Sequence, residues 1–358
     1  MEFIGEGSFE GHTLVVPAVS TGNVGQLAID LFLSTGRACG DVEEAVKRVG
    51  YLETGTVVPA VGYEVFAPGQ APQLCLNLEL HQMKGRKVTL LQQRGPVLPG
   101  REDAFAAEMM GWASKAGFEQ VLVLSGADAA SSGEEPCPLG TGMGGLAAAR
   151  FYRARPSSPP PGTDSATVPG ACGLEEALAA AGVRELDPAR WAPEPSGADL
   201  ARGLAALGNY GLGDQGPGGE RRGAADVPEE DEALREAEED KDLPPLPEGV
   251  GVCRHLCKHA ARGPTPLVLL TLFCTEGDNA PQALAMATAA AGALGLDRLS
   301  GRLPPPGQGG TTSGPGGSSE GQGQGQTGGL TGAETPVAWS RPMSWVSFYG
   351  PAVPEDMY

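Results

Sequence analysis

The sequence predicts an α/β fold, in which a three-layer mixed sheet is flanked by helices and interrupted by long disordered inserts. First, an apolar strand at residues 13–19 runs through a short polar turn directly into a helical pattern. Second, residues 121–125 and 266–274 are continuous apolar runs, which are typical of strands that helices cover on both faces. Third, 55 Gly and 32 Pro among 358 residues mean that much of the chain cannot be packed core.

The helix expected after the first strand begins at Val24, with Asn23 as its expected N-cap. Its apolar residues recur at helical spacing: Val24, Leu27, Ala28, Leu31 and Phe32. Ile29 and Leu33 widen the apolar surface beyond a single stripe. Two interpretations of this helix stay open, namely deep burial in the core or coverage by another chain.

Alternation of apolar and polar residues predicts a β-hairpin between residues 74 and 93. Leucine occupies every second position of the first strand, at Leu74, Leu76, Leu78 and Leu80. After a turn at residues 84–85, residues 87–93 return as the second strand, and the alternation predicts one solvated face. A helix over about residues 103–116 then leads into the strand at 121–125.

Composition divides the chain into core and inserts, because segments rich in Gly, Pro, Ser and acidic residues bury too little apolar surface to offset their ordering entropy. The expected organisation is an N-terminal part of the α/β core at 1–125, a low-complexity and acidic insert, mostly disordered, at 126–246, a C-terminal part of the same core at 247–300, a Gly/Gln-rich linker at 301–336 and an aromatic C-terminal tail at 337–358. Within the insert, the pattern permits short helices at 174–181 and 199–207. A further helix is expected over 281–296.

The net charge of −19 argues against a nucleic-acid partner or an anionic membrane, since neutralising phosphates requires clustered Lys and Arg. The longest apolar run, at 266–274, is far shorter than the ~20 residues that cross a bilayer. The seven Cys are scattered, and the opening MEFIGEG lacks the features of a secretory signal. We therefore expect reduced thiols and a cytoplasmic and nuclear location.

Two motifs in the sequence have residue types found in cofactor or metal sites. Gly211, Gly213 and Gly216 match the spacing of a dinucleotide fingerprint, but no strand precedes them and Pro217 opposes a following helix. A second motif alternates two ligand types at two-residue steps: Cys253, His255, Cys257 and His259. One extended strand would place all four on one face, whereas a helix would scatter them. We expect neither a cofactor nor a metal, and no catalytic residue, because no nucleophile or metal-protease motif is present.

Two loops at strand ends offer an alternative. The turn at Ser20, Thr21, Gly22 and Asn23 carries hydroxyl and amide groups at a helix N-terminus, where anions bind. The loop at 276–279 places Glu276 and Asp278 between a strand and a helix, where Asp278 or Asn279 is also an expected helix cap. A capped turn is the preferred interpretation. The alternative is a nucleoside- or phosphate-handling α/β enzyme that uses both loops.

Four sequence blocks carry a resemblance to a known family: TLVVPAVSTGNVGQLAIDL at 13–31, VGYLETGTVVPAVG at 49–62, FCTEGDNAPQAL at 273–284 and SWVSFYG at 344–350. In that order they resemble the proteasome assembly chaperone 2 family of 20S proteasome alpha-ring chaperones, over roughly residues 11–124, 247–296 and 337–358. The resemblance implies a non-enzymatic chaperone that forms a heterodimer with proteasome assembly chaperone 1. It also implies binding to 20S proteasome alpha subunits, promotion of alpha-ring assembly and a block on off-pathway ring dimers.

The resemblance gives two candidate partner-binding regions. The first is the apolar helix face, at Val24, Leu27 and Leu31, which belongs either in the core or against the partner chaperone. The second is the tail, where the resemblance implies docking of its aromatic residues on the body and insertion of its last residues between alpha subunits. The last residues are Asp356, Met357 and Tyr358. Tyr358 stands one place later than the hydrophobic-Tyr-any motif of related chaperones, so insertion and a frayed end both stay open.

Overall fold

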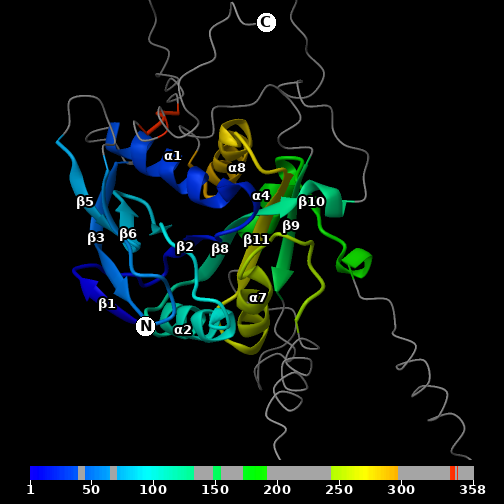
Figure 1. The fold of residues 1–358 in the computed structure, drawn as a ribbon, viewed down its shortest axis with the longest axis horizontal. Coiled ribbons are helices and arrows are strands. Elements are labelled where there is room, and N and C mark those ends of the chain that lie inside the picture. The colour runs from blue at the N-terminus through cyan, green and yellow to red at the C-terminus, as the bar shows by residue number, and fades with distance from the viewer. Residues whose placement is uncertain are drawn as a thin grey trace, which may run out of the picture.

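A nine-stranded mixed β-sheet forms the centre of the computed structural model, which describes residues 1–38, 45–64, 71–132, 148–154, 172–191, 243–296, 339–342 and 345 (Figure 1). In spatial order its strands are β1 (Glu2–Gly5), β3 (Val46–Glu53), β6 (Leu78–Met83), β7 (Val88–Gln93), β2 (Thr13–Pro17), β8 (Gln120–Asp128), β11 (Leu267–Cys274), β9 (Ala149–Ala154) and β10 (Arg184–Glu185). A separate two-stranded antiparallel sheet consists of β4 (Val61–Glu64) and β5 (Gln73–Leu76).

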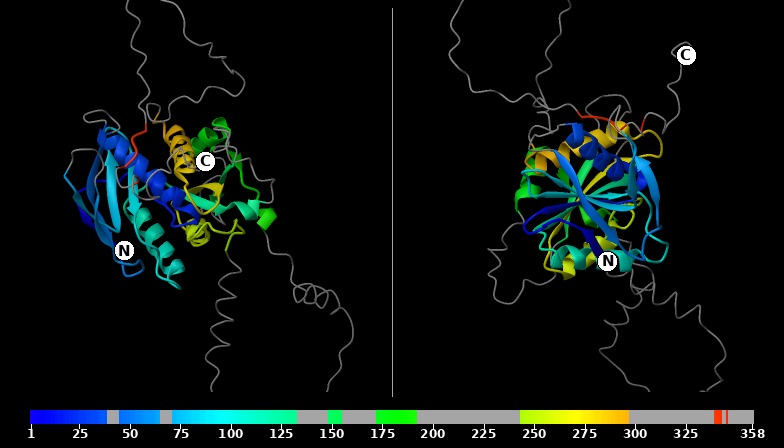
Figure 2. Two further views of the ribbon diagram at one scale, coloured as in Figure 1. Left: turned by 45° about the horizontal axis from the view of Figure 1, so that its top comes forward. Right: turned by 90° about the vertical axis from the view of Figure 1, so that its left-hand side faces the viewer.

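Helices cover both faces of the large sheet, as Figures 1 and 2 show. One face carries α1 (Val24–Ala38), α4 (Cys172–Ala180) and α8 (Ala280–Ala293), and the other carries α2 (Glu102–Lys115) and α7 (Cys253–Arg262). Successive residues of β2 point to opposite faces, so Val15 packs under α1 while Leu14 and Val16 pack toward α2. The predicted class, a mixed sheet flanked by helices in three layers, is confirmed.

Four adjacent strands of the sheet run parallel, β7, β2, β8 and β11, and the last three carry the apolar runs noted in the sequence. In register, Leu14 of β2 pairs with Val121 of β8, and Leu122 of β8 pairs with Val268 of β11. Almost every residue of these strands is buried, as their unbroken apolar runs predicted. Because the strands are parallel, their carboxyl ends meet at one edge of the sheet and bring the loops at Ser20 and Asp278 together.

The helix α1 begins at Val24, as predicted, but Asn23 is not its N-cap. Asn23 lies in a 3-10 helix over Thr21–Asn23 and has a φ of 52°, which is the left-handed region, whereas an N-cap residue has extended backbone. Gly22 before it also has a positive φ of 64°, so the chain makes a tight turn at these two residues before the α-helix begins. Ile29 and Leu33 are both fully buried, and deep burial is therefore the interpretation that the structure supports for α1.

The predicted hairpin at 74–93 is right in its turn and wrong in its first strand. β6 and β7 pair antiparallel around Gly85, whose φ is 74°. The run of alternating leucines, however, is divided at Asn77 between two sheets. The Asn77 amide accepts backbone N–H groups of Arg94 and Gly95 at 2.9 and 2.7 Å, and this holds the chain where it leaves the large sheet. The solvated face was also a wrong prediction, since β7 is buried at every position.

The expected insert at 126–246 contributes to the core at several places, which corrects that interpretation for the residues described. β8 continues to Asp128, β9 pairs antiparallel with β11, and α4 buries Leu174 and Leu178 against α8. The helix predicted at 174–181 therefore exists, with slightly earlier bounds. The predicted helix at 199–207, the glycine motif at 211–216, the linker and the residues Asp356, Met357 and Tyr358 lie outside the described residues.

Candidate functional site

The two loops proposed as a ligand site do lie side by side at the carboxyl end of the central strands. The Cys274 thiol donates to the Thr21 carbonyl oxygen at 3.3 Å, and a Cβ placed on Gly22 would lie 2.3 Å from Asn279 Nδ2. A Cβ on Gly126 would lie 2.0 Å from the Thr21 carbonyl oxygen. Glycine at positions 22 and 126 is thus required by close packing of the loops against one another.

The polar groups of these loops bind other parts of the chain. Ser20 Oγ donates to the Ala18 carbonyl at 3.1 Å and accepts the Gly126 N–H at 2.8 Å. Asn279 Nδ2 donates to the carbonyl oxygens of residues 275 and 277, and Asp278 Oδ1 accepts the Ala280 N–H at 3.0 Å. These contacts favour the capped turn over the phosphate cradle, because the Ser20 hydroxyl and the Asn279 amide would be needed as donors to an anion and the Asp278 carboxylate would repel one.

The alternating Cys and His residues lie on α7, a helix, and are therefore scattered over two faces. Cys253 and Cys257 face the core and are buried. Burial raises the pKa of the Cys253 thiol to about 12 and raises that of Cys257 well above its usual value, so both stay protonated at neutral pH. Within the described ranges, no three His, Cys, Asp or Glu side chains are arranged to hold a metal ion.

The two histidines of α7 face Asp103 at the start of α2. Asp103 Oδ1 lies 3.0 Å from Lys258 Nζ, 3.0 Å from His259 Nε2 and 3.5 Å from His255 Nδ1. Partial burial by itself would raise the pKa of Asp103, but hydrogen bonds from Lys258 and His259 outweigh it and lower that pKa to about 2. This cluster joins α2 to α7 on one face of the sheet.

The residues predicted on the partner-binding helix face lie inside the chain itself. Val24, Leu27 and Leu31 are 0%, 6% and 1% exposed and belong to the core between α1, α8 and the sheet. Their contact with a partner stays a prediction. The aromatic residues of the tail do dock on the body at the two positions described, Trp339 and Trp345, which both pack against the same core.

The tail docks through hydrogen bonds as well as ring contacts. Trp339 Nε1 donates to Thr288 Oγ1 of α8 at 3.1 Å, and the Ser340 N–H donates to Thr35 Oγ1 of α1 at 2.9 Å. Trp345 Nε1 lies 3.5 Å from Asp30 Oδ2 of α1. The described residues near the end of the chain therefore bridge α1 and α8, two of the three helices of that layer.

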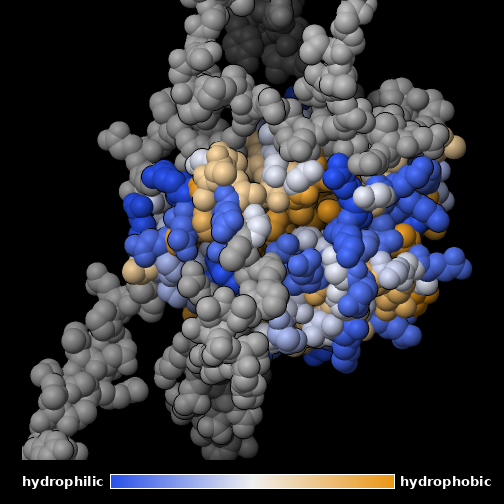
Figure 3. All heavy atoms as spheres, turned by 180° about the vertical axis from the view of Figure 1, so that it is seen from behind, coloured by the Kyte–Doolittle hydropathy of each residue, from blue (hydrophilic) through white to orange (hydrophobic). Residues whose placement is uncertain are grey.

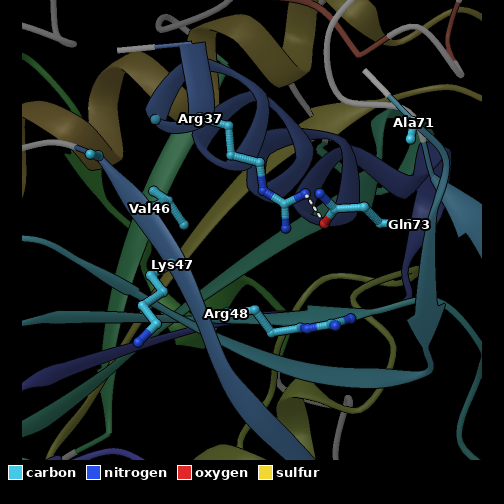
Figure 4. A pocket seen from close by; sticks show the side chains of 8 residues that line it. Arg37, Val46, Lys47, Arg48, Ala71 and Gln73 are labelled. Carbon is cyan, nitrogen blue, oxygen red and sulfur yellow. Dashed lines mark hydrogen bonds between the residues drawn. The ribbon is translucent and has the colours of Figure 1, made fainter. Parts of the chain in front are cut away.

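Sequence reasoning missed an open cavity of about 650 Å³ at the end of α1. Its lining includes Arg37, Val46, Lys47, Arg48, Ala71 and Gln73 (Figure 4). Arg37 extends from α1 toward Gln73 and donates to its Oε1 at 3.3 Å, while Lys47 and Arg48 come from β3. Burial, together with the neighbouring cations, lowers the pKa of Arg37 to about 10, even though Glu79 opposes this, so the group stays charged at neutral pH. Two adjacent cations, Lys47 and Arg48, in so acidic a chain were the feature of the sequence that could have indicated this cavity.

A buried ion network lies beside this cavity and joins α1 to the small sheet. Arg94, at the end of β7, donates to Asp30 of α1 at 2.9 Å and forms a short ion pair with Glu64 of β4. Gln92 Nε2 also donates to Asp30, at 3.1 Å. Asp30 and Glu64 are each buried, so the guanidinium of Arg94 supplies the opposite charge that burial of two carboxylates requires.

Comparison with known proteins identifies the family. The model of the PAC2 family matches residues 14–290, which include all of the large sheet except β1. The chain belongs to the PAC2 family. The bounds of the match enclose β9 and α4, which lie in the segment expected to be an insert and are part of the core.

Within the PAC2 family, the chain is similar to several proteins named proteasome assembly chaperone 2. It is 37% identical over 124 residues to that of Danio rerio, a match that covers 34% of this chain and 45% of the relative. It is 36% identical over 117 residues to that of Homo sapiens, with 32% and 41% covered, and 33% identical over 126 residues to that of Nematostella vectensis, with 35% and 49% covered. Each match thus spans less than half of the relative.

Two solved structures are similar across most of the chain. Pyrococcus furiosus PbaA, described as an archaeal homolog of proteasome-assembly chaperone, is 12% identical with a TM-score of 0.43, and the match covers 82% of this chain and 85% of that one. A PAC2 family protein from Streptomyces avermitilis is 14% identical with a TM-score of 0.31, and the match covers 80% of this chain and 95% of that one.

Proposed function

We propose that this chain is a proteasome assembly chaperone that pairs with proteasome assembly chaperone 1 and promotes assembly of the 20S proteasome alpha ring. In this role it would also block off-pathway dimers of alpha rings, in the cytoplasm and the nucleus. The observation that carries the proposal is the PAC2 family match over residues 14–290, together with identities of 33–37% to proteins named proteasome assembly chaperone 2.

The described site supports a binding role through the contacts of its polar groups. At the strand ends, where α/β enzymes place their ligands, the polar groups of Ser20 and Asn279 are engaged by the chain itself. We therefore place the function on protein surfaces and not in a ligand pocket at the strand ends. None of the described helices is long and apolar enough to cross a membrane.

Co-expression with proteasome assembly chaperone 1 of the same organism tests the proposal. With one chain tagged, native mass spectrometry should show a one-to-one complex that captures 20S alpha subunits. Recovery of this chain without the other chaperone and without alpha subunits would contradict the proposal. Deleting Met357 and Tyr358 should weaken capture of alpha subunits and leave the heterodimer intact, as expected if the tail engages the ring.

A further inference from the structure

The small sheet presents an apolar face to solvent. The antiparallel register pairs Val61 with Leu76 and Tyr63 with Leu74, so these four side chains share one face of the β4–β5 hairpin. Val61 is 70% exposed, Tyr63 is 77% exposed and Leu74 is 48% exposed, while Leu76 is half-buried. We call these four residues the hairpin face. Apart from Ile4, they include all the large hydrophobic residues that are exposed in the described part of the chain.

The opposite face of the hairpin is fixed to the body. Glu64 and Cys75 point inward and are buried, and Glu64 pairs with Arg94 in the ion network described above. At the strand backbone, Arg48 Nη1 donates to the Leu74 carbonyl at 2.7 Å and Glu79 Oε1 accepts the Leu76 N–H at 3.1 Å. A two-stranded sheet is only marginally stable alone. These anchors therefore hold the hairpin face in place, facing outward.

Another apolar area is a weaker candidate for an interface. Figure 3 shows the side of the molecule opposite to Figure 1, where hydrophobic residues gather in the upper middle, in the region of α4 and α8. Four hydrophobic residues in or directly after α8 are only partly buried, yet all pack against the core: Leu284, Ala285, Ala293 and Leu294. The hairpin face differs because its side chains are mostly in solvent, and exposed large apolar residues that are contiguous mark interaction sites.

The charges beside the hairpin face indicate what binds there. Arg37, Lys47 and Arg48 line the cavity together with Gln73 of β5, so three cations lie beside the hairpin in a chain whose net charge is −19, and Arg48 reaches the Leu74 carbonyl at the edge of the hairpin face. Lys47 and Arg48 are both exposed, and Arg48 also forms an ion pair with Glu79 at 2.8 Å. The surface that complements this arrangement is an apolar patch flanked by carboxylates.

We propose that the hairpin face, with Lys47 and Arg48 at its border, is the surface that receives the partner chaperone, through apolar residues flanked by carboxylates on that partner. This inference rests on the proposed function and names the interface that it requires. A permanent partner suits this face better than a transient one, because permanent interfaces are the more hydrophobic class and because exposed strands rich in apolar residues promote aggregation unless they are covered.

A competition between variant and wild type tests this interface. Wild-type full chain and a variant that differs in mass are co-expressed with a limiting amount of tagged proteasome assembly chaperone 1, and the two complexes are compared by native mass spectrometry. The variant carries Val61→Thr and Tyr63→Thr, since threonine keeps the β-propensity of an exposed strand while removing apolar surface. We expect the variant complex to be at least tenfold less abundant than the wild-type complex, at equal levels of the two free chains.

Matched controls distinguish a loss of interface contacts from a loss of folding stability. Ile4→Thr removes an exposed apolar residue from β1, opposite Tyr51 of β3 and outside the hairpin, and should compete equally with wild type. Lys47→Glu should weaken the complex more at low salt than at high salt, whereas Lys115→Glu, on the exposed end of α2, should not. Circular dichroism melts of the variants should match that of wild type.

The possible outcomes distinguish the two proposals. If wild type forms no complex with the tagged chaperone, the proposed function fails. If wild type forms the complex and the Val61→Thr and Tyr63→Thr variant competes equally, the proposed function stands and the hairpin face is not the interface. Equal competition for the chaperone combined with reduced recovery of alpha subunits would also overturn the inference, because the hairpin face would then bind alpha subunits.

Discussion

The indole ring of Trp339 meets the ring of Phe32 edge to face, with centroids 5.2 Å apart and planes at 87°. Phe32 is fully buried in α1, and Trp339 lies near the end of the chain, after the linker. Together with the hydrogen bond from Trp339 to Thr288 of α8, this contact closes the layer that α1 and α8 form over the sheet. Trp339 is thus part of the core that it covers.

Replacing this tryptophan should destabilise the fold. Trp339→Ala removes the aromatic pair and the hydrogen bond to Thr288, and we expect a loss of about 1–3 kcal/mol in the free energy of unfolding. Trp339→Phe keeps a ring against Phe32 and should lose only about 1 kcal/mol, the part that belongs to the hydrogen bond. Urea unfolding of the three proteins measures both values. Equal stability of Trp339→Ala and wild type would show that the tail does not contribute to the core.

Replacing Leu31 should act on the fold before it acts on any partner. Its side chain is 1% exposed in the lone chain, so Leu31→Asp would bury an unpaired carboxylate and should leave little folded protein. The milder Leu31→Ala should cost about 2–5 kcal/mol of unfolding free energy. Thermal melting monitored by circular dichroism checks both. A Leu31→Asp protein that melts like wild type would contradict the observed burial.

The contribution of Asp103 to stability should depend on pH in a defined window. Its folded pKa of about 2 lies below the ordinary value of 3.8, so the ionised group stabilises the folded state above pH 3.8 and this stabilisation is lost as the pH falls toward 2. Asp103→Asn should therefore lower the unfolding free energy at pH 5, and the difference from wild type should shrink between pH 4 and pH 2. A difference that stays constant over this window would mean that Lys258 and His259 do not hold the carboxylate.

The buried thiols should react slowly in the folded protein. With a pKa of about 12 in place of 9.0, the thiolate fraction of Cys253 falls about a thousandfold, and burial slows the approach of reagents further. Iodoacetamide labelling at pH 8, mapped by mass spectrometry, should therefore leave Cys253 and Cys257 unlabelled until urea is added. Labelling of Cys253 in native protein at the rate of a free thiol would contradict its burial on the inner side of α7.

The parts of the fold that follow from local patterns were predictable. The strand at 13–17, the start of α1, the helix α2 and the buried strands β8 and β11 each show a continuous apolar run or a helical period over their own residues. The split of the leucine run at Asn77 was not, because it depends on amide contacts with residues 94 and 95. The spacing of apolar residues along a strand does not indicate which sheet that strand joins.

The remaining features depend on contacts between residues far apart in the sequence, so local patterns did not predict them. β9 is a short strand whose Arg150 is buried. The sequence of residues 149–154 does not show the pattern of a core strand, and the strand is recognised only from its pairing with β11. The basic cavity combines α1, β3 and the beginning of β5, and the hairpin face depends on the pairing of β4 with β5, which are separate segments of the chain. Such sites arise from tertiary structure, so the family resemblance predicted a partner without indicating the surface that binds it.

The parallel centre of the sheet also constrains how the protein is synthesised. Thr13 pairs with Gln120 and Val121 pairs with Leu267, so the three central strands cannot assemble until β11 has left the ribosome. Pairing over such separations is slow, because the loops must close before any contact forms. During translation, one edge of β8 therefore stays unpaired until β11 has been synthesised. We expect this nascent intermediate, more than the finished fold, to limit the yield of active protein in the cell.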